Sequence, residues 1–163
     1  MIQEPIIDWN EVLAELTATL REYLRIDTSN PPGNEEVAAR FLGSILQREG
    51  FSAEYIEAAP GRVSLRAVLK GRGEEPPLML LNHTDVVPAQ PEFWEVDPFA
   101  GVERDGCIWG RGALDMKGMG ILELLVLLLL KRHGITPNRD IIYLAVADEE
   151  CGSVQGMEWL DSQ

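Results

Sequence analysis

Hydrophobic residues recur at helical spacing near the start of the chain. Over residues 9–25 the apolar positions return every three or four residues, and Asp8 precedes them as a side chain that can cap a helix. A second pattern of this kind covers residues 34–49 and ends at Gly50, a residue typical of the position after a helix. The prolines and glycine of residues 31–33 separate the two patterns. We therefore predict two amphipathic helices joined by a tight, irregular segment.

Four later segments have the pattern of β-strands. Residues 53–57 and 63–69 lie close enough in sequence to form a hairpin, and the second alternates apolar with polar residues. Residues 78–81 and 140–147 are almost continuously apolar, which is typical of central strands covered on both faces. The sequence therefore predicts a sheet with a hairpin at one side and two buried strands.

Helical patterns return after the third predicted strand. A helix is expected over residues 117–132 and another from about residue 154, while residues 84–115 form a long, irregular segment rich in proline and glycine. Such long loops are uncommon in compact domains and are often functional. Because helices alternate with buried strands, we predict one domain over residues 1–163, with an α/β fold. Its architecture is expected to be a three-layer α/β/α sandwich around a mixed, mostly parallel sheet.

The composition narrows the class of protein. The chain has 163 residues, and its 27 acidic against 14 basic side chains give a net charge of −13. Such a charge disfavours nucleic acids and anionic membranes, which bind clustered lysine and arginine. Hydrophobic residues at 45% and charged residues at 25% are typical of globular proteins and argue against general disorder. We therefore expect a globular protein with neither a nucleic-acid nor a membrane partner.

The sequence shows no recognisable targeting signal or membrane span, and its cysteines indicate no particular function. The most apolar run, residues 121–130, is too short for a membrane span, which needs about 20 residues. The opening residues have neither the basic nor the apolar region of a secretory signal, so a cytoplasmic protein is expected. Cys107 and Cys151 are too few for a disulfide framework and are expected to be structural or incidental.

Both apolar strands end in side chains that bind metals or move protons. One strand is followed by His83 and Asp85, and the other by the three acidic residues 148–150. Between them a glycine-rich segment carries Asp115 and leads into a helix. Ligands in open α/β sheets bind beyond the carboxyl ends of the strands, so we expect these three pieces to converge. One imidazole with several carboxylates suits zinc.

The spacing within each piece agrees with such a site. His83 and Asp85 are two residues apart and share a face in an extended chain, so the carboxylate can fix the orientation of the imidazole. Asp115 has two oxygens that could bridge two cations. Glu149 and Glu150 diverge in an extended chain, one toward metal and one toward a water. Because zinc lowers the pKa of water to about 7 and a carboxylate can accept the proton, the set indicates a hydrolase.

Each piece also has a simpler interpretation. A His-x-Asp at a strand end is commonly a surface polar pair, Asp115 could cap the following helix, and the pair Glu149-Glu150 could be a solvated turn. The glycines around Asp115 could form a tight turn or an anion-binding loop, although the GK[ST] ending of a P-loop is lacking. These separate interpretations leave unexplained why three such pieces stand at predicted strand ends in one short chain.

Four motifs together resemble a known family. RIDTSNPPGNE, LLNHTDVVP, WGRGALDMKG and ADEECGS occur in the order and spacing of the zinc aminoacylase/carboxypeptidase family, metallopeptidase family 20. That family includes glutamate carboxypeptidase, aminoacylase, acetylornithine deacetylase and succinyl-diaminopimelate desuccinylase. The resemblance covers about residues 25–160, nearly the whole chain. It implies a zinc-exopeptidase-like fold and a site with two zinc ions.

The resemblance also implies a role for each site residue. His83 would ligate one zinc, Glu150 the other, and Asp115 both. Asp85 would brace the imidazole of His83 from behind. Glu149 would be the general base that deprotonates the attacking water and then protonates the leaving amine. Relatives often have a cis peptide directly after the bridging aspartate, which here would be the bond following Asp115.

Family members are more than twice as long as this chain, which implies missing parts. Their remaining ligands, an acidic residue and a histidine, would lie beyond Gln163, as would an inserted lid domain that usually carries the dimer contact. We therefore expect residues 1–163 to be the N-terminal part of a catalytic domain. With two protein ligands for each zinc instead of three or four, the chain alone is expected to bind zinc weakly and to be nearly inactive.

Three functions are consistent with these residues. The leading hypothesis is a di-zinc exopeptidase or dipeptidase acting on small substrates that carry a carboxylate, with a homodimer possible for the full-length protein. A second is a deacylase of N-acyl amino acids, of the acetylornithine or succinyl-diaminopimelate type. A third, of another class, is a non-catalytic fragment that serves only as a binding module. The sequence does not separate the first two, because specificity would be set by the lid and by later loops.

Overall fold

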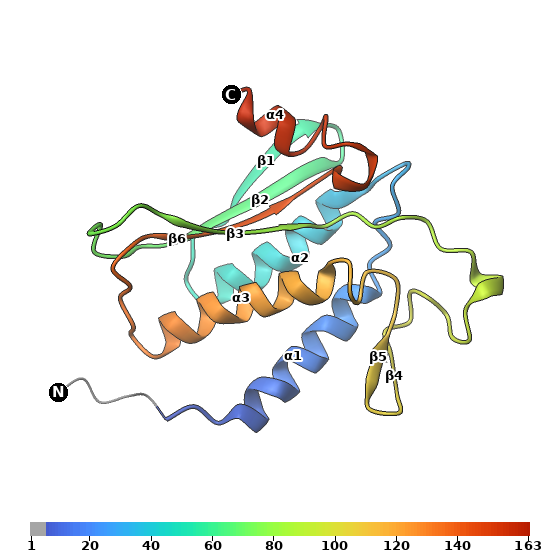
Figure 1. Cartoon of the computed structure of the whole chain (residues 1–163), viewed down its shortest axis with the longest axis horizontal. Helices are drawn as coiled ribbons and strands as arrows, with labels where there is room; N and C mark the ends of the chain where they lie inside the picture. Colours follow the sequence, from blue (N-terminus) through green and yellow to red (C-terminus); the bar gives the residue numbers. More distant parts are fainter. Residues whose placement is uncertain (1–5) are drawn as a thin grey trace.

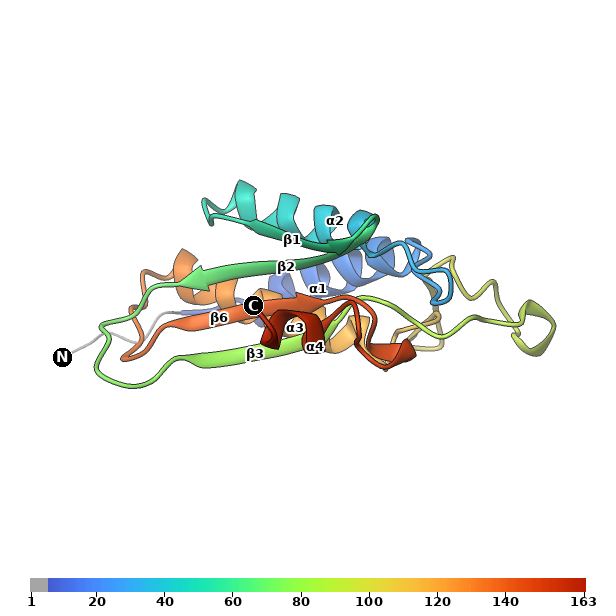
Figure 2. The ribbon, with the colours of Figure 1, turned by 90° about the horizontal axis from the view of Figure 1, so that it is seen from above.

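A four-stranded mixed sheet forms the centre of the computed structural model, which describes residues 6–163 (Figure 1). Its strands are β1 (Glu54–Ala59), β2 (Arg62–Leu69), β3 (Leu78–His83) and β6 (Ile141–Val146). They lie in the order β1-β2-β6-β3, as the view from above shows (Figure 2). The pairs β1–β2 and β2–β6 are antiparallel, and β6–β3 is parallel.

This arrangement confirms the mixed sheet and the predicted hairpin, but the expectation of a mostly parallel sheet is wrong for the described strands. The hairpin reverses the chain, so β2 runs opposite to β6 when it pairs with it. Only β3 and β6 are joined by a helical crossover, the connection that parallel neighbours require.

The helices divide unequally between the two faces of the sheet. They are α1 (Trp9–Leu24), α2 (Glu35–Arg48), α3 (Lys117–Arg132) and α4 (Met157–Asp161). The first three cover one face, and α4 lies on the other (Figure 1). Within residues 6–163 the third layer of the sandwich therefore consists of this one short helix.

Helix starts and ends follow the predicted signals closely. The side chain of Asp8 accepts hydrogen bonds from the backbone of Asn10 and Glu11, as an N-cap should. Gly50 follows α2 with a positive φ of 75°, and its N–H donates to the carbonyl of Gln47. The predicted helix over residues 117–132 coincides with α3.

The core lies between the sheet and the three helices of the covered face. α2 packs on β2, and α3 packs on β3, β6 and α1. The largest fully buried apolar side chains come from all of these layers: Tyr23, Leu24, Leu42, Leu46, Leu65, Ile121, Leu124, Leu127, Leu128 and Tyr143. This continuous core sets the positions of β3 and β6, the strands whose ends carry the candidate chemistry.

One strand assignment needs correction. Residues 78–81 were expected to form a central strand covered on both faces, but β3 is at an edge of the described sheet. Met79 and Leu81 remain 44% and 42% exposed because they point away from α1–α3, toward the face that carries only α4. The other continuously apolar strand, β6, is central as predicted, with β2 and β3 on its two sides.

The long segment 84–115 is more ordered than its composition suggests. It contains a 3-10 turn at Pro91–Phe93 and a small hairpin of β4 (Val102–Arg104) and β5 (Cys107–Trp109), which projects from the body of the protein (Figure 1). The turn between the strands is Asp105-Gly106, both with positive φ. Such a dipeptide is a signal for a two-residue hairpin turn, but strands of three residues are too short for an alternation pattern.

The described residues also bear on the predicted absence of a membrane span. No helix within residues 6–163 has the length and apolarity to cross a bilayer. The apolar run 121–130 lies in α3, and four of its seven leucines are buried in the core. The expected absence of a secretory signal concerns the opening residues of the chain. Residues 1–5 lie outside the described part, so this expectation stays a prediction.

Candidate active site

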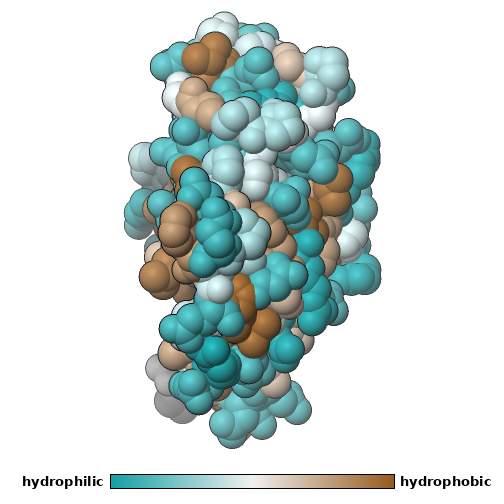
Figure 3. All heavy atoms as spheres, turned by 90° about the vertical axis from the view of Figure 1, so that its right-hand side faces the viewer, coloured by the Kyte–Doolittle hydropathy of each residue, from teal (hydrophilic) through white to brown (hydrophobic). Residues whose placement is uncertain are grey.

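The parallel pairing of β3 and β6 brings the predicted site residues together. His83, the last residue of β3, is in register with Val146, the last residue of β6. The N–H of Thr84 donates to the carbonyl of Val146 at 2.9 Å, which extends the pairing by one residue. The C-terminal ends of both strands therefore lie at the same end of the sheet, and the polar residues that follow them lie side by side. The surface at this end is mostly hydrophilic, with scattered hydrophobic side chains (Figure 3).

A sharp turn after β6 positions the two adjacent glutamates. Asp148 has a left-handed backbone with φ 65°, which aspartate tolerates better than most residues, and the chain then makes the 3-10 turn Glu149–Cys151. This turn directs the N–H groups of Glu149 and Glu150 toward the side chain of Asp85, at 3.1 and 3.0 Å. The two glutamates thus belong to a turn fixed to the end of β3.

Side chains from three segments converge at the C-terminal ends of β3 and β6. The Nε2 atom of His83 lies 3.1 Å from Oδ1 of Asp115 and 3.8 Å from Oε2 of Glu149. Ligand atoms of His83, Glu149 and Glu150 all lie within 4.8 Å of one another. The structure therefore brings together the histidine and the three carboxylates that the sequence singled out as metal ligands and general base.

Asp115 does not cap the helix that follows it. Met116 holds the N-cap position of α3, without a side-chain hydrogen bond to the helix, and the carboxylate of Asp115 is 78% exposed. The Asp115–Met116 peptide bond is cis, as the resemblance implied. Asp115 is thus available on the side of the site that faces solvent.

These residues fit a zinc ion by their chemistry and orientation. The Nδ1 atom of His83 lies 3.0 Å from the backbone carbonyl of Asp85. A proton on Nδ1 would be donated to that carbonyl and would leave the lone pair of Nε2 facing the carboxylates, which is the usual arrangement of a ligating histidine. Nitrogen and carboxylate oxygen are common zinc ligands. His83, Asp115, Glu149 and Glu150 supply such a donor set.

The carboxylates shift the proton affinities of the site in the absence of a cation. Burial alone would lower the pKa of His83, but hydrogen bonds to Asp85 and Asp115 raise it to about 9. Burial and the neighbouring carboxylates of Asp115, Asp85 and Glu149 raise the pKa of Glu150. At least one carboxylate here is therefore harder to ionise while the charges are uncompensated.

Asp85 has more partners than the sequence indicated. Its carboxylate lies 3.5 Å from Nδ1 of His83, and it also accepts hydrogen bonds from the amide of Asn30 and from the two backbone N–H groups of the 149–150 turn. Burial would raise the pKa of Asp85, but these partners lower it, so it stays a carboxylate. It connects the imidazole with the turn as well as bracing the ring.

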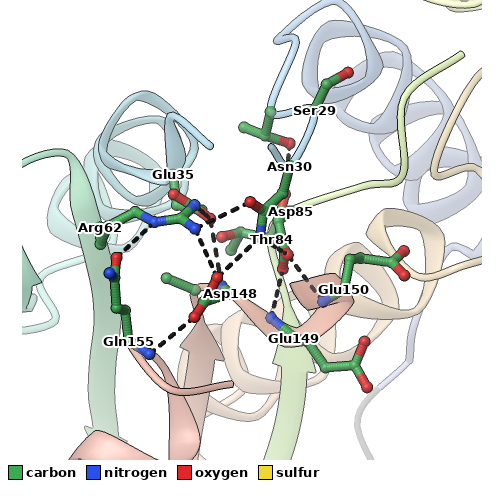
Figure 4. Close-up of polar contacts among 12 residues, drawn as sticks. Ser29, Asn30, Glu35, Arg62, Thr84, Asp85, Asp148, Glu149, Glu150 and Gln155 are labelled. Carbon is green, nitrogen blue, oxygen red and sulfur yellow. Dashed lines mark hydrogen bonds and ion pairs between the residues drawn. The ribbon is translucent and has the colours of Figure 1, made fainter. Parts of the chain in front are cut away.

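Four polar residues, three of them buried and one nearly so, form a connected cluster behind the site (Figure 4). They are Asn30, Glu35, Arg62 and Asp148, which are joined by hydrogen bonds and ion pairs. The first two lie in the motif RIDTSNPPGNE, and Asp148 is the second residue of ADEECGS, so motif membership was their signal. Arg62 lies outside every motif, and nothing in its sequence neighbourhood distinguishes it from other arginines.

Comparisons with known proteins agree with the geometry. The sequence profile of peptidase family M20/M25/M40 matches residues 79–162. Aminoacylase-1 of Sus scrofa is 43% identical over 142 residues, which cover 85% of this chain and 34% of that protein. An N-fatty-acyl-amino acid synthase/hydrolase of Xenopus tropicalis is 39% identical over 153 residues, covering 88% of this chain and 30% of that protein.

A solved structure shows the same arrangement of elements. An M20 family metallo-carboxypeptidase from Sulfolobus solfataricus superposes with a TM-score of 0.78 at 27% identity, over 86% of this chain and 32% of that one. The chain spans about a third of the length of the curated relatives it matches. The residues matched by the family profile include His83, Asp115 and the 149–150 turn.

Proposed function

The chain belongs to peptidase family M20/M25/M40, and from this membership we propose that the complete protein is a zinc-dependent hydrolase of amide bonds in small substrates. The observation that carries the proposal is the convergence of His83, Asp115, Glu149 and Glu150 where β3 and β6 end. Residues 1–163 would form the N-terminal part of its catalytic domain, in keeping with their share of the length of aminoacylase-1.

We assign His83, Asp115 and Glu150 as the residues that would hold the metal; in a site with two zinc ions, Asp115 would serve both. Bound zinc would polarise the substrate carbonyl and lower the pKa of a nearby water. The exposed carboxylate of Asp115 and the buried ring of His83 hold their ligand atoms 3.1 Å apart, which suits a common cation. Asp85 keeps Nε2 of His83 directed at that position.

Glu149 is proposed as the general base. Its carboxylate is 52% exposed, and Oε2 lies 3.8 Å from Nε2 of His83, so it reaches both the site and solvent. The Glu149 carboxylate takes a proton from water as the water oxygen bonds to the amide carbon. It then delivers that proton to the amide nitrogen as the C–N bond breaks, releasing a carboxylic acid and an amine.

Two substrate classes remain to be separated by experiment. The exopeptidase or dipeptidase hypothesis is supported by the likeness to a metallo-carboxypeptidase. Hydrolysis of N-acyl amino acids is supported by the higher identities to aminoacylase-1 and to an N-fatty-acyl-amino acid synthase/hydrolase. The intact Glu149 argues against a non-catalytic binding module, because a scaffold does not need a general base. A cytoplasmic location and a homodimer of the full-length protein complete the proposal.

The direct test uses the complete protein loaded with zinc. We expect it to release free amine from N-acetyl amino acids or from dipeptides, and the faster of the two identifies the class. Glu149→Gln is expected to lower kcat at least about 100-fold while zinc stays bound, because it removes the proton acceptor but none of the assigned ligands. Zinc-independent activity, or full activity in Glu149→Gln, would contradict the proposal.

A zinc measurement tests the assigned ligands in the chain of 163 residues. Equilibrium dialysis with elemental analysis is expected to find weak binding, because each ion would have few protein ligands. Glu150→Ala should weaken that binding further. Two tightly held zinc ions per chain, unaffected by Glu150→Ala, would show that the assigned ligands are not the ones used.

A further inference from the structure

We propose that Arg62 is a positioning residue of the candidate active site, holding the turn that carries the general base and a metal ligand. Arg62 begins β2 and contributes nothing to the donor set itself. Its guanidinium lies behind the site, where the close-up shows it directed at Asp148 and Asn30 (Figure 4). The proposal rests on the function proposed above, because that function gives a reason for the hydrogen-bonded network at the end of β6.

The guanidinium bonds to segments that are distant in sequence. One terminal nitrogen donates to Glu35 at 2.5 Å, and the other donates to Asp148 at 2.6 Å and to Asn30 at 3.0 Å. The Nε atom donates to Gln155 at 2.9 Å. These partners come from α2, from the segment after α1 and from both ends of the turn after β6. Only a planar group with five N–H donors can bond to all of them at once, which a lysine ammonium cannot do.

The charges of this cluster require a cation. Glu35 and Asp85 are fully buried and Asp148 is 4% exposed, so three carboxylates share one enclosed region. The Arg62 side chain is itself only 11% exposed. Removing one partner of a buried ion pair leaves an uncompensated charge, which is strongly unfavourable. The positive charge of Arg62 therefore compensates the buried acidic side chains directly behind a site that itself contains carboxylates.

Asn30 transmits the effect of Arg62 to the turn. Because its Oδ1 accepts from Arg62, its amide nitrogen faces the other way and donates to Asp85 at 2.8 Å and to Asp148 at 3.0 Å. The same oxygen of Asp85 accepts the N–H of Glu150, and the other oxygen accepts the N–H of Glu149. Three hydrogen bonds thus join the guanidinium to the backbone of the metal ligand Glu150.

A test can distinguish positioning from general stabilisation. Arg62→Lys keeps the positive charge but loses the planar guanidinium and its five N–H donors. Arg66→Lys is the matched control. Arg66 lies four residues further along β2, where it pairs with exposed Glu54 on the surface. Amide hydrogen exchange of the metal-free chain of 163 residues, followed by NMR, reports on the turn itself.

We expect the amides of Glu149 and Glu150 to exchange about tenfold faster in Arg62→Lys than in Arg66→Lys, relative to the amides of β6. Zinc binding should weaken by about 10–100-fold, as is typical when a group that orients metal ligands is lost. Equal changes at the turn and in β6 would mean that Arg62 only stabilises the fold, and no change at the turn would likewise overturn the proposal.

Asn30→Ala keeps the test decisive if Arg62→Lys fails to fold. This variant leaves the ion pairs of Arg62 with Glu35 and Asp148 in place. It removes the side-chain hydrogen bonds of Asn30, and with them the connection from Arg62 to Asp85. It should reproduce the faster exchange at Glu150, and unchanged exchange there would refute the proposed connection. Because the exchange measurement needs neither metal nor substrate, a wild-type protein without zinc binding or hydrolysis would count against the proposed function alone.

Discussion

A buried lysine lies directly behind the segment that presents Asp115. Lys117, the first residue of α3, is fully buried, with its ammonium 4.7 Å from the centre of the Tyr23 ring and donating to the carbonyl of Ile26 at 2.6 Å. It thereby ties the start of α3 to the end of α1. Burial lowers the pKa of Lys117 to about 7, so the residue changes charge in the ordinary range of experiments.

This shift predicts a pH-dependent stability. Between about pH 7 and 10.5 the unfolded chain holds a proton on Lys117 that the folded chain has released, so its contribution to the free energy of unfolding rises with pH. His83 acts in the opposite direction. Its pKa is raised in the fold, so its contribution is complete below about pH 6.5 and is lost as the pH rises through about 9.

Comparison with Lys117→Met separates the two contributions. The free energy of unfolding of the wild type minus that of the variant should increase with pH above about 7, with a slope approaching about 1.4 kcal/mol per pH unit. Urea unfolding at pH 6.5, 8 and 9.5 would measure it. A difference that is constant over this range would mean that Lys117 titrates normally.

At this scale the sequence predicted the residues whose positions follow from strand ends. His83, Asp85 and the 149–150 turn were found because two apolar strands each run into polar side chains, and parallel pairing brings those ends together. Arg62 and Lys117 could not be found from strand ends. Lys117 does lie in the motif WGRGALDMKG, but an isolated basic residue carries no sign of burial. Their positions are determined by partners distant in the sequence, such as Asp148 for Arg62.

The turn after β6 is the element on which the candidate site depends most. It begins at Asp148 and returns to pack against the end of the strand, where Gly156 is buried. A Cβ at Gly156 would collide with the backbone carbonyl of Ala147. Since backbone atoms cannot rotate away as a side chain can, the absence of a side chain at Gly156 permits the close return of the chain.

Gly156→Ala is therefore expected to destabilise the protein by about 2–3 kcal/mol, as overpacking does. Gly61→Ala is the control, because Gly61 has a φ of 79° but nothing within 4 Å of a Cβ, so only the backbone penalty of about 1 kcal/mol applies. Urea unfolding of both variants gives the comparison. Equal costs would indicate that the 148–156 turn can move away from β6 without loss.

Among the elements, periodic patterns were the reliable guides. α1, α2 and α3 were predicted to within a residue or two, because each is long enough to show repeated apolar positions. The β4–β5 hairpin was missed because its strands have three residues each. Strand direction was misjudged because apolar content indicates burial but not the direction in which a neighbouring strand runs.

The whole molecule is asymmetric across its sheet. Helices α1–α3 cover one face, whereas the other carries α4 and a groove of about 240 Å³ lined by apolar side chains that include Met79, Leu144 and Leu160. β3 also presents an open strand edge beside this groove in the described residues. Exposed apolar surface next to a free edge favours association with other chains.

We expect the chain of 163 residues to self-associate as its concentration rises, and Met79→Lys to reduce this association. The substitution places a charge on the open face at a side chain that is already 44% exposed, so the fold should persist. Leu13→Lys, at a 61% exposed position on α1, is the control on the opposite side. Sedimentation velocity would measure both, and association reduced equally by the two variants would exclude the open face as its cause.

Among the described strands, the central strand β6 is made after the others. β6 lies between β2 and β3, yet it follows them in the chain by some 70 and 60 residues. Until residues 141–146 have been made, β2 therefore lacks its second neighbour and β3 lacks its neighbour in the described sheet. Because pairings between distant segments form slowly, the nascent β3 must wait with its apolar residues uncovered. The histidine and the glutamates would then meet in the same late step that closes the sheet, so folding of the described chain and assembly of its site would be one event.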